Sequence, residues 1–232
     1  MQRTAFTFYE MLVVIAVSSI LLMALLAGCS SVSKNKPGPS SPISDAGTPV
    51  PDTEQDRGPV LLQANTRPSY NVTHVPKRPD AVGNLGVPLR RKWNYVVIHH
   101  SSTHNGNEAS FDRHHRENNG WLGVGYDFVI GNGHGSSDGK VEVTFRWEKQ
   151  MHGAHAGVNL YNQHGIGICL VGNFEKSSPT RKQIASLASL VNYLQERCDI
   201  PTSRILLHRH VRNTKCPGEN FPFYEFISLL EH

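Results

Sequence analysis

The feature that most restricts how this 232-residue chain can fold is a change of composition along it. Residues 11–26 form an apolar run without a charged side chain. Residues 30–59 are rich in Pro, Ser, Gly and Asp, and they carry too few large apolar side chains to offset the entropy lost on ordering. We therefore predict a flexible linker over 30–59, an irregular arm over 60–92 and one folded domain over 93–232.

The first 29 residues have the pattern of an export signal. The apolar run is shorter than the roughly 20 residues that a membrane span needs. The sequence Leu-Ala-Gly-Cys at 26–29 resembles the lipobox of bacterial lipoproteins, which implies that Cys29 is lipidated. The folded part would then be exported and anchored to a bacterial membrane, facing the periplasm or the cell surface.

Two other interpretations of this segment stay open. Residues 6–14 resemble the start of a type IV pilin helix, although Ala5 stands where that family has glycine. A plain cleaved signal or an uncleaved anchor would also export the rest of the chain.

The net charge gives no support for a nucleic-acid partner. Lys and Arg number 23 and Asp and Glu number 19, so the excess is 23 − 19 = +4. This excess is too small to indicate a nucleic-acid groove, and we predict a monomer without a nucleic-acid partner.

The folded part alternates apolar runs, typical of buried strands, with helical segments. Thr180 and Gln183 fit a capping box, and the apolar residues that follow recur on one helix face. The predicted strands cover 94–99, 124–130, 141–147, 165–172 and 204–208, and the predicted helices cover 107–119 and 180–197. This order predicts an α/β fold, with a mixed central β-sheet flanked by helices.

Three side chains that lie far apart in the sequence are candidate metal ligands. His99 and His208 each end a predicted strand, where a rigid scaffold can hold a site. Cys216 follows His208 by eight residues. Two imidazoles and a thiolate suit Zn²⁺, and three protein ligands leave a fourth position open for water, as in catalytic zinc sites.

Four segments in a fixed order resemble the type 2 zinc N-acetylmuramoyl-L-alanine amidases. This family includes phage lysozyme-type amidases and peptidoglycan recognition proteins. The segments are VIHHSST at 97–103, GWLGVGYDFVI at 120–130, GIGICLVG at 165–172, and His208 followed at a fixed spacing by Cys216-Pro217. The resemblance implies a zinc ion in a surface groove. It also implies hydrolysis of the amide between N-acetylmuramic acid and the L-alanine of the stem peptide, in peptidoglycan or in muropeptides.

The resemblance also implies roles for single residues. It makes His99, His208 and Cys216 the zinc ligands. Tyr126 takes the place of the family's catalytic tyrosine, and Thr214 that of a residue that helps to stabilise the oxyanion. His155 stands where the family has a groove histidine, which implies contact with substrate.

One departure from the family concerns the general base. Some members carry a glutamate as proton acceptor on the strand at 165–172, and this chain has none there. The resemblance leaves this role to Tyr126 or to the water on the metal. A non-catalytic peptidoglycan-binding receptor on the same fold is the alternative function.

The remaining candidates have more ordinary expected roles. His100 points away from His99 along a strand, so we expect it to pack or to support the site. We expect His114 and His115 to be solvated and Trp121 to pack in the core. Cys169 and Cys198 could form a disulfide or remain two free thiols. The G-x-S-x-G match at 135–139 lies between two predicted strands, which is the wrong context for a serine hydrolase elbow.

Overall fold

The computed structural model describes residues 71–231. The predicted export signal, Cys29 and the linker over 30–59 lie outside the described residues. Within 71–231, no helix is both long enough and apolar enough to cross a membrane.

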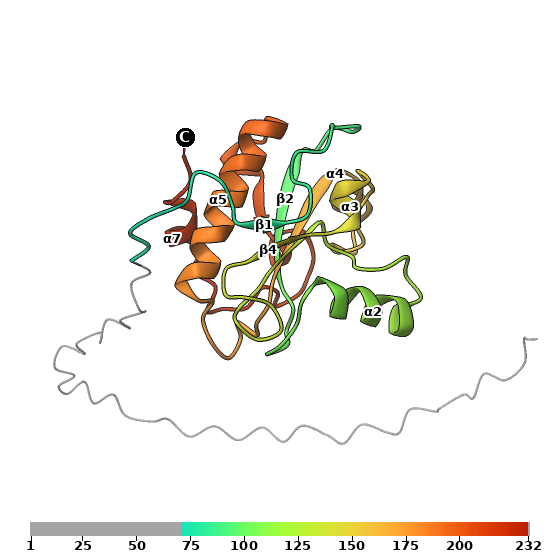
Figure 1. Ribbon diagram of the computed structural model, residues 1–232, viewed down its shortest axis with the longest axis horizontal. Coiled ribbons are helices and arrows are strands. Elements are labelled where there is room, and N and C mark those ends of the chain that lie inside the picture. The colour runs from blue at the N-terminus through green and yellow to red at the C-terminus, as the bar shows by residue number, and fades with distance from the viewer. Residues whose placement is uncertain (1–70, 232) are drawn as a thin grey trace, which may run out of the picture. The chain divides into compact units, whose positions relative to one another are not determined.

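A six-stranded mixed sheet forms the centre of the described part, which confirms the predicted fold class (Figure 1). Its spatial order is β1-β4-β3-β5-β2-β6; only β3 and β4 pair antiparallel. The strands are β1 (Ala81–Val82), β2 (Tyr95–His100), β3 (Phe128–Ile130), β4 (Val141–Val143), β5 (Gly165–Leu170) and β6 (Ile205–Leu207). The helices are α2 (Glu108–Asn119), α3 (Phe145–Glu148), α4 (Asn159–His164), α5 (Arg181–Cys198), α6 (His208–Val211) and α7 (Phe223–Ile227), with a 3₁₀ turn at Thr202–Arg204.

The two faces of the sheet have different tasks. In β2, Val96 and Ile98 point to the large core that includes the apolar side of α5. The alternation of side chains along a strand turns His99 to the opposite face. Its register partner on β5, Cys169, lies on that same face. Figure 1 shows α5 on one side of the sheet and α2, α3 and α4 on the other.

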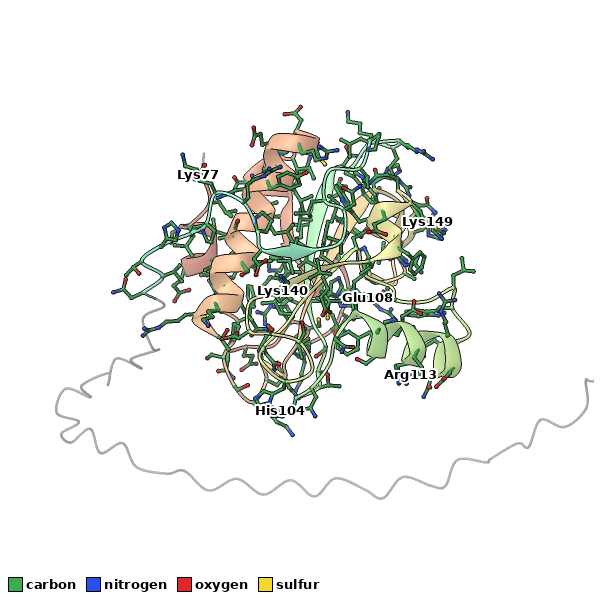
Figure 2. All side chains as sticks on the ribbon, viewed as in Figure 1. Lys77, His104, Glu108, Arg113, Lys140 and Lys149 are labelled. Carbon is green, nitrogen blue, oxygen red and sulfur yellow. The ribbon has the colours of Figure 1, made fainter. Side chains whose placement is uncertain are left out.

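The two predicted helices are present, and side-chain caps fix where they begin. The Asn107 side chain accepts a hydrogen bond from the Ser110 backbone N–H, and α2 ends at Gly120, whose φ of 66° suits glycine. Thr180 and Gln183 form the predicted capping box of α5. Figure 2 shows Glu108 at the end of α2 that is nearer the sheet and Arg113 farther out.

The strands predicted over 165–172 and 204–208 are each two residues shorter than predicted, and those predicted over 124–130 and 141–147 are each four residues shorter. Residues 124–127 form no strand, because side chains of α2 bind their backbone groups. The Val124 N–H donates to Asp112 Oδ1 (2.8 Å), and the Gly125 N–H donates to His115 Nδ1 (3.0 Å). The strand predicted over 141–147 stops at Val143, because Thr144 caps the short helix α3.

The segment before Trp93 packs on the domain from residue 71 onward. It is irregular apart from β1, which pairs with β4. The Leu85 carbonyl accepts hydrogen bonds from Trp147 Nε1 (3.0 Å) and from the Tyr193 hydroxyl (3.1 Å). Val87 is buried in the main core.

Candidate metal centre

Three side chains from separate elements converge on the face of the sheet opposite α5. His99 is the penultimate residue of β2, and His208 directly follows the neighbouring strand β6. Cys216 lies in the loop after α6. Their candidate ligand atoms all lie within 4.8 Å of one another, and His99 Nδ1 is 3.8 Å from Cys216 Sγ.

Backbone contacts hold the cysteine loop against the sheet. The Cys216 carbonyl accepts a hydrogen bond from the Arg209 N–H (2.9 Å), and its sulfur accepts one from the His100 N–H (3.4 Å). The Thr214 hydroxyl oxygen accepts from the Cys216 N–H (3.3 Å). Thr214 therefore shapes the turn that presents the sulfur.

The hydrogen bonds of His208 decide which ring nitrogen faces a metal. Its Nε2 lies 3.1 Å from the Ala156 carbonyl oxygen. Because a carbonyl only accepts, Nε2 carries the proton and Nδ1 keeps its lone pair. A lone pair on neutral imidazole is what a metal ion requires.

Burial keeps the imidazoles of the two candidate ligands His99 and His208 neutral. It lowers the pKa of His99 well below its usual value, and the nearby His155 and His208 lower it further. Burial also lowers the pKa of His208. It raises the pKa of the Cys216 thiol to about 11. A bound cation opposes that last effect, since a coordinating thiol is deprotonated outright.

His155 lies deeper than the sequence indicated. Its side chain is only 9% exposed, and its Nδ1 is 3.1 Å from His99 Nε2. Its other nitrogen, Nε2, is 3.3 Å from the Gly165 carbonyl oxygen. The buried ring thus contacts a candidate metal ligand, while its contact with substrate stays a prediction.

Tyr126 lies beside the three candidate ligands, in the irregular segment before β3 and not on a strand as predicted. Its ring centroid is 5.2 Å from that of His99. Burial raises the pKa of Tyr126 well above its usual value, and the neighbouring Cys169 and Cys216 add to this. At neutral pH the hydroxyl is therefore protonated and can donate a hydrogen bond.

Comparison with known proteins places this site in a family. Residues 89–219 match the family described as N-acetylmuramoyl-L-alanine amidase (Amidase_2). The chain belongs to this family. The matched range contains all three candidate ligands together with Tyr126 and Thr214.

Individual relatives of this amidase-family chain bear different names. Peptidoglycan-recognition protein SC2 of Drosophila melanogaster is 33% identical over 138 residues, covering 54% of this chain and 68% of the relative. The human N-acetylmuramoyl-L-alanine amidase is 30% identical over 115 residues, covering 49% of this chain and 18% of the relative. The solved amidase LysC from Clostridium intestinale URNW superposes with a TM-score of 0.53 at 32% identity, covering 64% of this chain and 93% of that one.

The predicted burial of Trp121 and of His115 was wrong. Trp121 is not in the core, because 41% of its side chain is exposed. His115 is half-buried, with its ring centroid 4.9 Å from that of Trp121 and 5.9 Å from that of Tyr126. Its Nδ1 accepts the Gly125 N–H, so the ring is held beside the site.

The other candidates agree with their expected roles or lie apart from the site. His100 is buried, and its Nδ1 accepts the Phe174 N–H (3.1 Å), which supports the turn after β5. Cys169 and Cys198 are free thiols.

Sequence reasoning missed Asp127, which is fully buried directly before β3. One of its carboxylate oxygens accepts the Gly167 N–H (2.8 Å), and the other has no hydrogen-bond partner. Burial raises the pKa of Asp127 from 3.8 to about 7. The signal was present, since Asp127 is a lone carboxylate in the apolar run 124–130.

Proposed function

We propose that this protein is a zinc-dependent peptidoglycan hydrolase. Its substrate would be the amide between N-acetylmuramic acid and the L-alanine of the stem peptide. The observation that carries the proposal is the convergence of His99, His208 and Cys216 within 4.8 Å, with the Tyr126 ring beside them. Two histidines and a cysteine fit Zn²⁺ and leave its fourth position open.

The metal, Tyr126 and Thr214 have separate roles in the proposed reaction. A zinc ion bound there supplies Lewis-acid polarisation of the scissile carbonyl and activates water. The protonated Tyr126 hydroxyl donates a hydrogen bond to the negative charge that develops on the carbonyl oxygen. Thr214 supports the same charge and holds the Cys216 turn in place.

The strand β5 offers no carboxylate as general base. Cys169 is the β5 residue paired in register with His99, and burial raises the pKa of its thiol well above its usual value. A thiol that stays protonated does not accept the proton of the attacking water. We assign the proton to the leaving amine nitrogen, and the Tyr126 hydroxyl beside the site can assist its transfer.

The alternative is a receptor that binds peptidoglycan without cleaving it. Relatives named peptidoglycan-recognition proteins favour it. The retained His, His and Cys set together with Tyr126 favours the hydrolase, because binding alone needs no open metal position. Peptidoglycan or muropeptides are the partner under either function.

Mass spectrometry of digested peptidoglycan separates the two functions. The hydrolase releases stem peptides with a free L-alanine amino group, and a chelator stops their release. The Cys216→Ala variant should lose both zinc and activity. Cys198→Ala is the matched control, because Cys198 is also a partly buried free thiol but lies at the end of α5. Binding of peptidoglycan without any released peptide would favour the receptor.

We also propose that the protein is exported and held at a bacterial membrane by a lipid on Cys29, and that it acts as a monomer without a nucleic-acid partner. The apolar run at 11–26 and the lipobox-like sequence support the anchor. Metabolic labelling with palmitate should mark the wild type and not the Cys29→Ala variant. Labelling that persists in the variant would contradict the anchor.

A further inference from the structure

We propose that His155 is a positioning residue, which acts through His99 by fixing the tautomer and the orientation of the metal-facing imidazole. The inference rests on the metal site of the proposed function and assigns this histidine a task other than contact with substrate.

The Gly165 carbonyl decides the direction of the hydrogen bonds that join it to His155 and His99. The Gly165 carbonyl only accepts, so the proton of His155 is on Nε2. In neutral imidazole the other nitrogen then accepts, so His155 Nδ1 receives the proton of His99 Nε2, 3.1 Å away. His99 Nδ1 is left with its lone pair, and this is the nitrogen 3.8 Å from Cys216 Sγ.

The burial of His155 and its two contacts support this arrangement. The ring is only 9% exposed, and each of its nitrogens lies within hydrogen-bond distance of one protein group, the Gly165 carbonyl or the His99 ring. Metal-binding histidines usually donate their second N–H to a carboxylate, a carbonyl or water, and removal of that partner costs metal affinity. His208 uses the Ala156 carbonyl in this way, and His99 uses His155.

Two glycines form the slot that holds the ring. A Cβ added at Gly167 would lie 2.5 Å from His155 Cδ2, and one added at Gly153 would lie 2.3 Å from the same atom. Gly167 lies within β5, where glycine weakens a strand and marks a close approach. Glycine at position 167 therefore leaves room for the His155 imidazole beside His99, at the cost of a less stable strand.

The test is the zinc affinity of the full chain, measured by competition with a chromophoric chelator at one neutral pH. His155→Leu should lower the affinity about 10–100-fold, because the His99 N–H loses its acceptor. His155→Asn should keep most of the affinity, since its amide oxygen can accept that N–H. Gly167→Ala should weaken zinc binding with the imidazole still present. His114→Leu, the same change at an exposed histidine of α2, should bind zinc like the wild type.

Three outcomes would overturn the inference. In the first, His155→Leu binds zinc as the wild type does and raises only the KM. His155 would then contact substrate and would not position His99. In the second, His155→Asn binds zinc as weakly as His155→Leu does while keeping the wild-type near-ultraviolet circular dichroism. The His155 ring would then only fill space beside His99 and would not act as a hydrogen-bond acceptor. In the third, the wild type binds no zinc at all. A wild type that binds zinc and cleaves no peptidoglycan would overturn the proposed hydrolase and leave this inference standing.

Discussion

Tyr126 is the residue at which catalysis can be tested separately from metal binding. The tyrosine hydroxyl interacts with the thiol of Cys169, and its ring lies against His99. The proposed zinc ligands are His99, His208 and Cys216, and Tyr126 is assigned to the reaction only. Its removal should therefore affect the reaction and spare the metal.

Tyr126→Phe should lower kcat about 10²-fold, the usual effect of losing one hydrogen-bond donor to an oxyanion. Its zinc affinity should match that of the wild type. Release of L-alanine-bearing peptides and the chelator competition measure the two properties on the same preparation. Unchanged release would remove Tyr126 from the chemistry.

Asp127 gives the domain a pH dependence of stability whose sign follows from burial. Its pKa in the folded state is about 7, raised from 3.8, so between about pH 4 and pH 7 the folded protein holds a proton that the unfolded chain has released. Stability then falls as the pH rises through that window.

Asp127→Asn should remove this dependence, because the amide does not titrate and its oxygen can still accept the Gly167 N–H. The free energy of unfolding of the variant, relative to the wild type, should increase steadily from pH 4 to pH 7. Denaturant titrations at several pH values measure it. A difference that stays constant across the window would show that Asp127 is ionised in the folded protein.

At the level of elements, the sequence predicted those helices whose capping residues and apolar periodicity lie within their own segment. The helix α5 carries its capping box and apolar periodicity within its own residues, and the helix 107–119 was found one residue from its observed start. The short helices α3, α4, α6 and α7 have four to six residues, too few for a periodic signal. Residues 124–127 form no strand because two side chains of the preceding helix α2, Asp112 and His115, bind their backbone groups, and no periodic pattern in 124–127 reveals these partners.

The cap of α5 supports a quantitative prediction. Thr180 Oγ1 accepts the Gln183 N–H (3.0 Å) and donates to Asp138 Oδ1 (2.6 Å), and Gln183 Oε1 accepts the Thr180 N–H (3.1 Å). Thr180→Ala should lower the free energy of unfolding by about 1–2 kcal/mol. Thr180→Ser keeps the hydroxyl and should lose far less. Equal losses in both variants would mean that the threonine methyl, and not the cap, stabilises this turn.

On the scale of the whole molecule, the sheet order assembles the site. His99 and Cys216 are 117 residues apart in sequence, and β6 delivers His208 only because it pairs with β2. Strand ends and the family resemblance named the three candidate ligands in advance. The sequence did not reveal the buried partners of the two histidines, the Ala156 carbonyl and His155, because both come from a loop that no periodicity describes.

This assembly predicts that zinc binding and folding are coupled. The three ligand atoms meet only in the folded chain, so zinc bound there stabilises the folded state by RT ln(1 + [L]/Kd), about 2.7 kcal/mol when free zinc is 100 times Kd. The Tm should therefore rise by several degrees when zinc is added to chelator-treated protein.

Variants decide whether that rise reports the proposed site. Cys216→Ala should abolish the shift, because one of the three ligands is lost. Cys198→Ala should keep it, since Cys198 belongs to α5, on the face of the sheet opposite the three candidate ligands, and is not one of them. Scanning calorimetry with and without zinc measures both. A shift that survives in Cys216→Ala would place the stabilising zinc at other histidines of the chain, and the coupling between this sheet and its metal would be refuted.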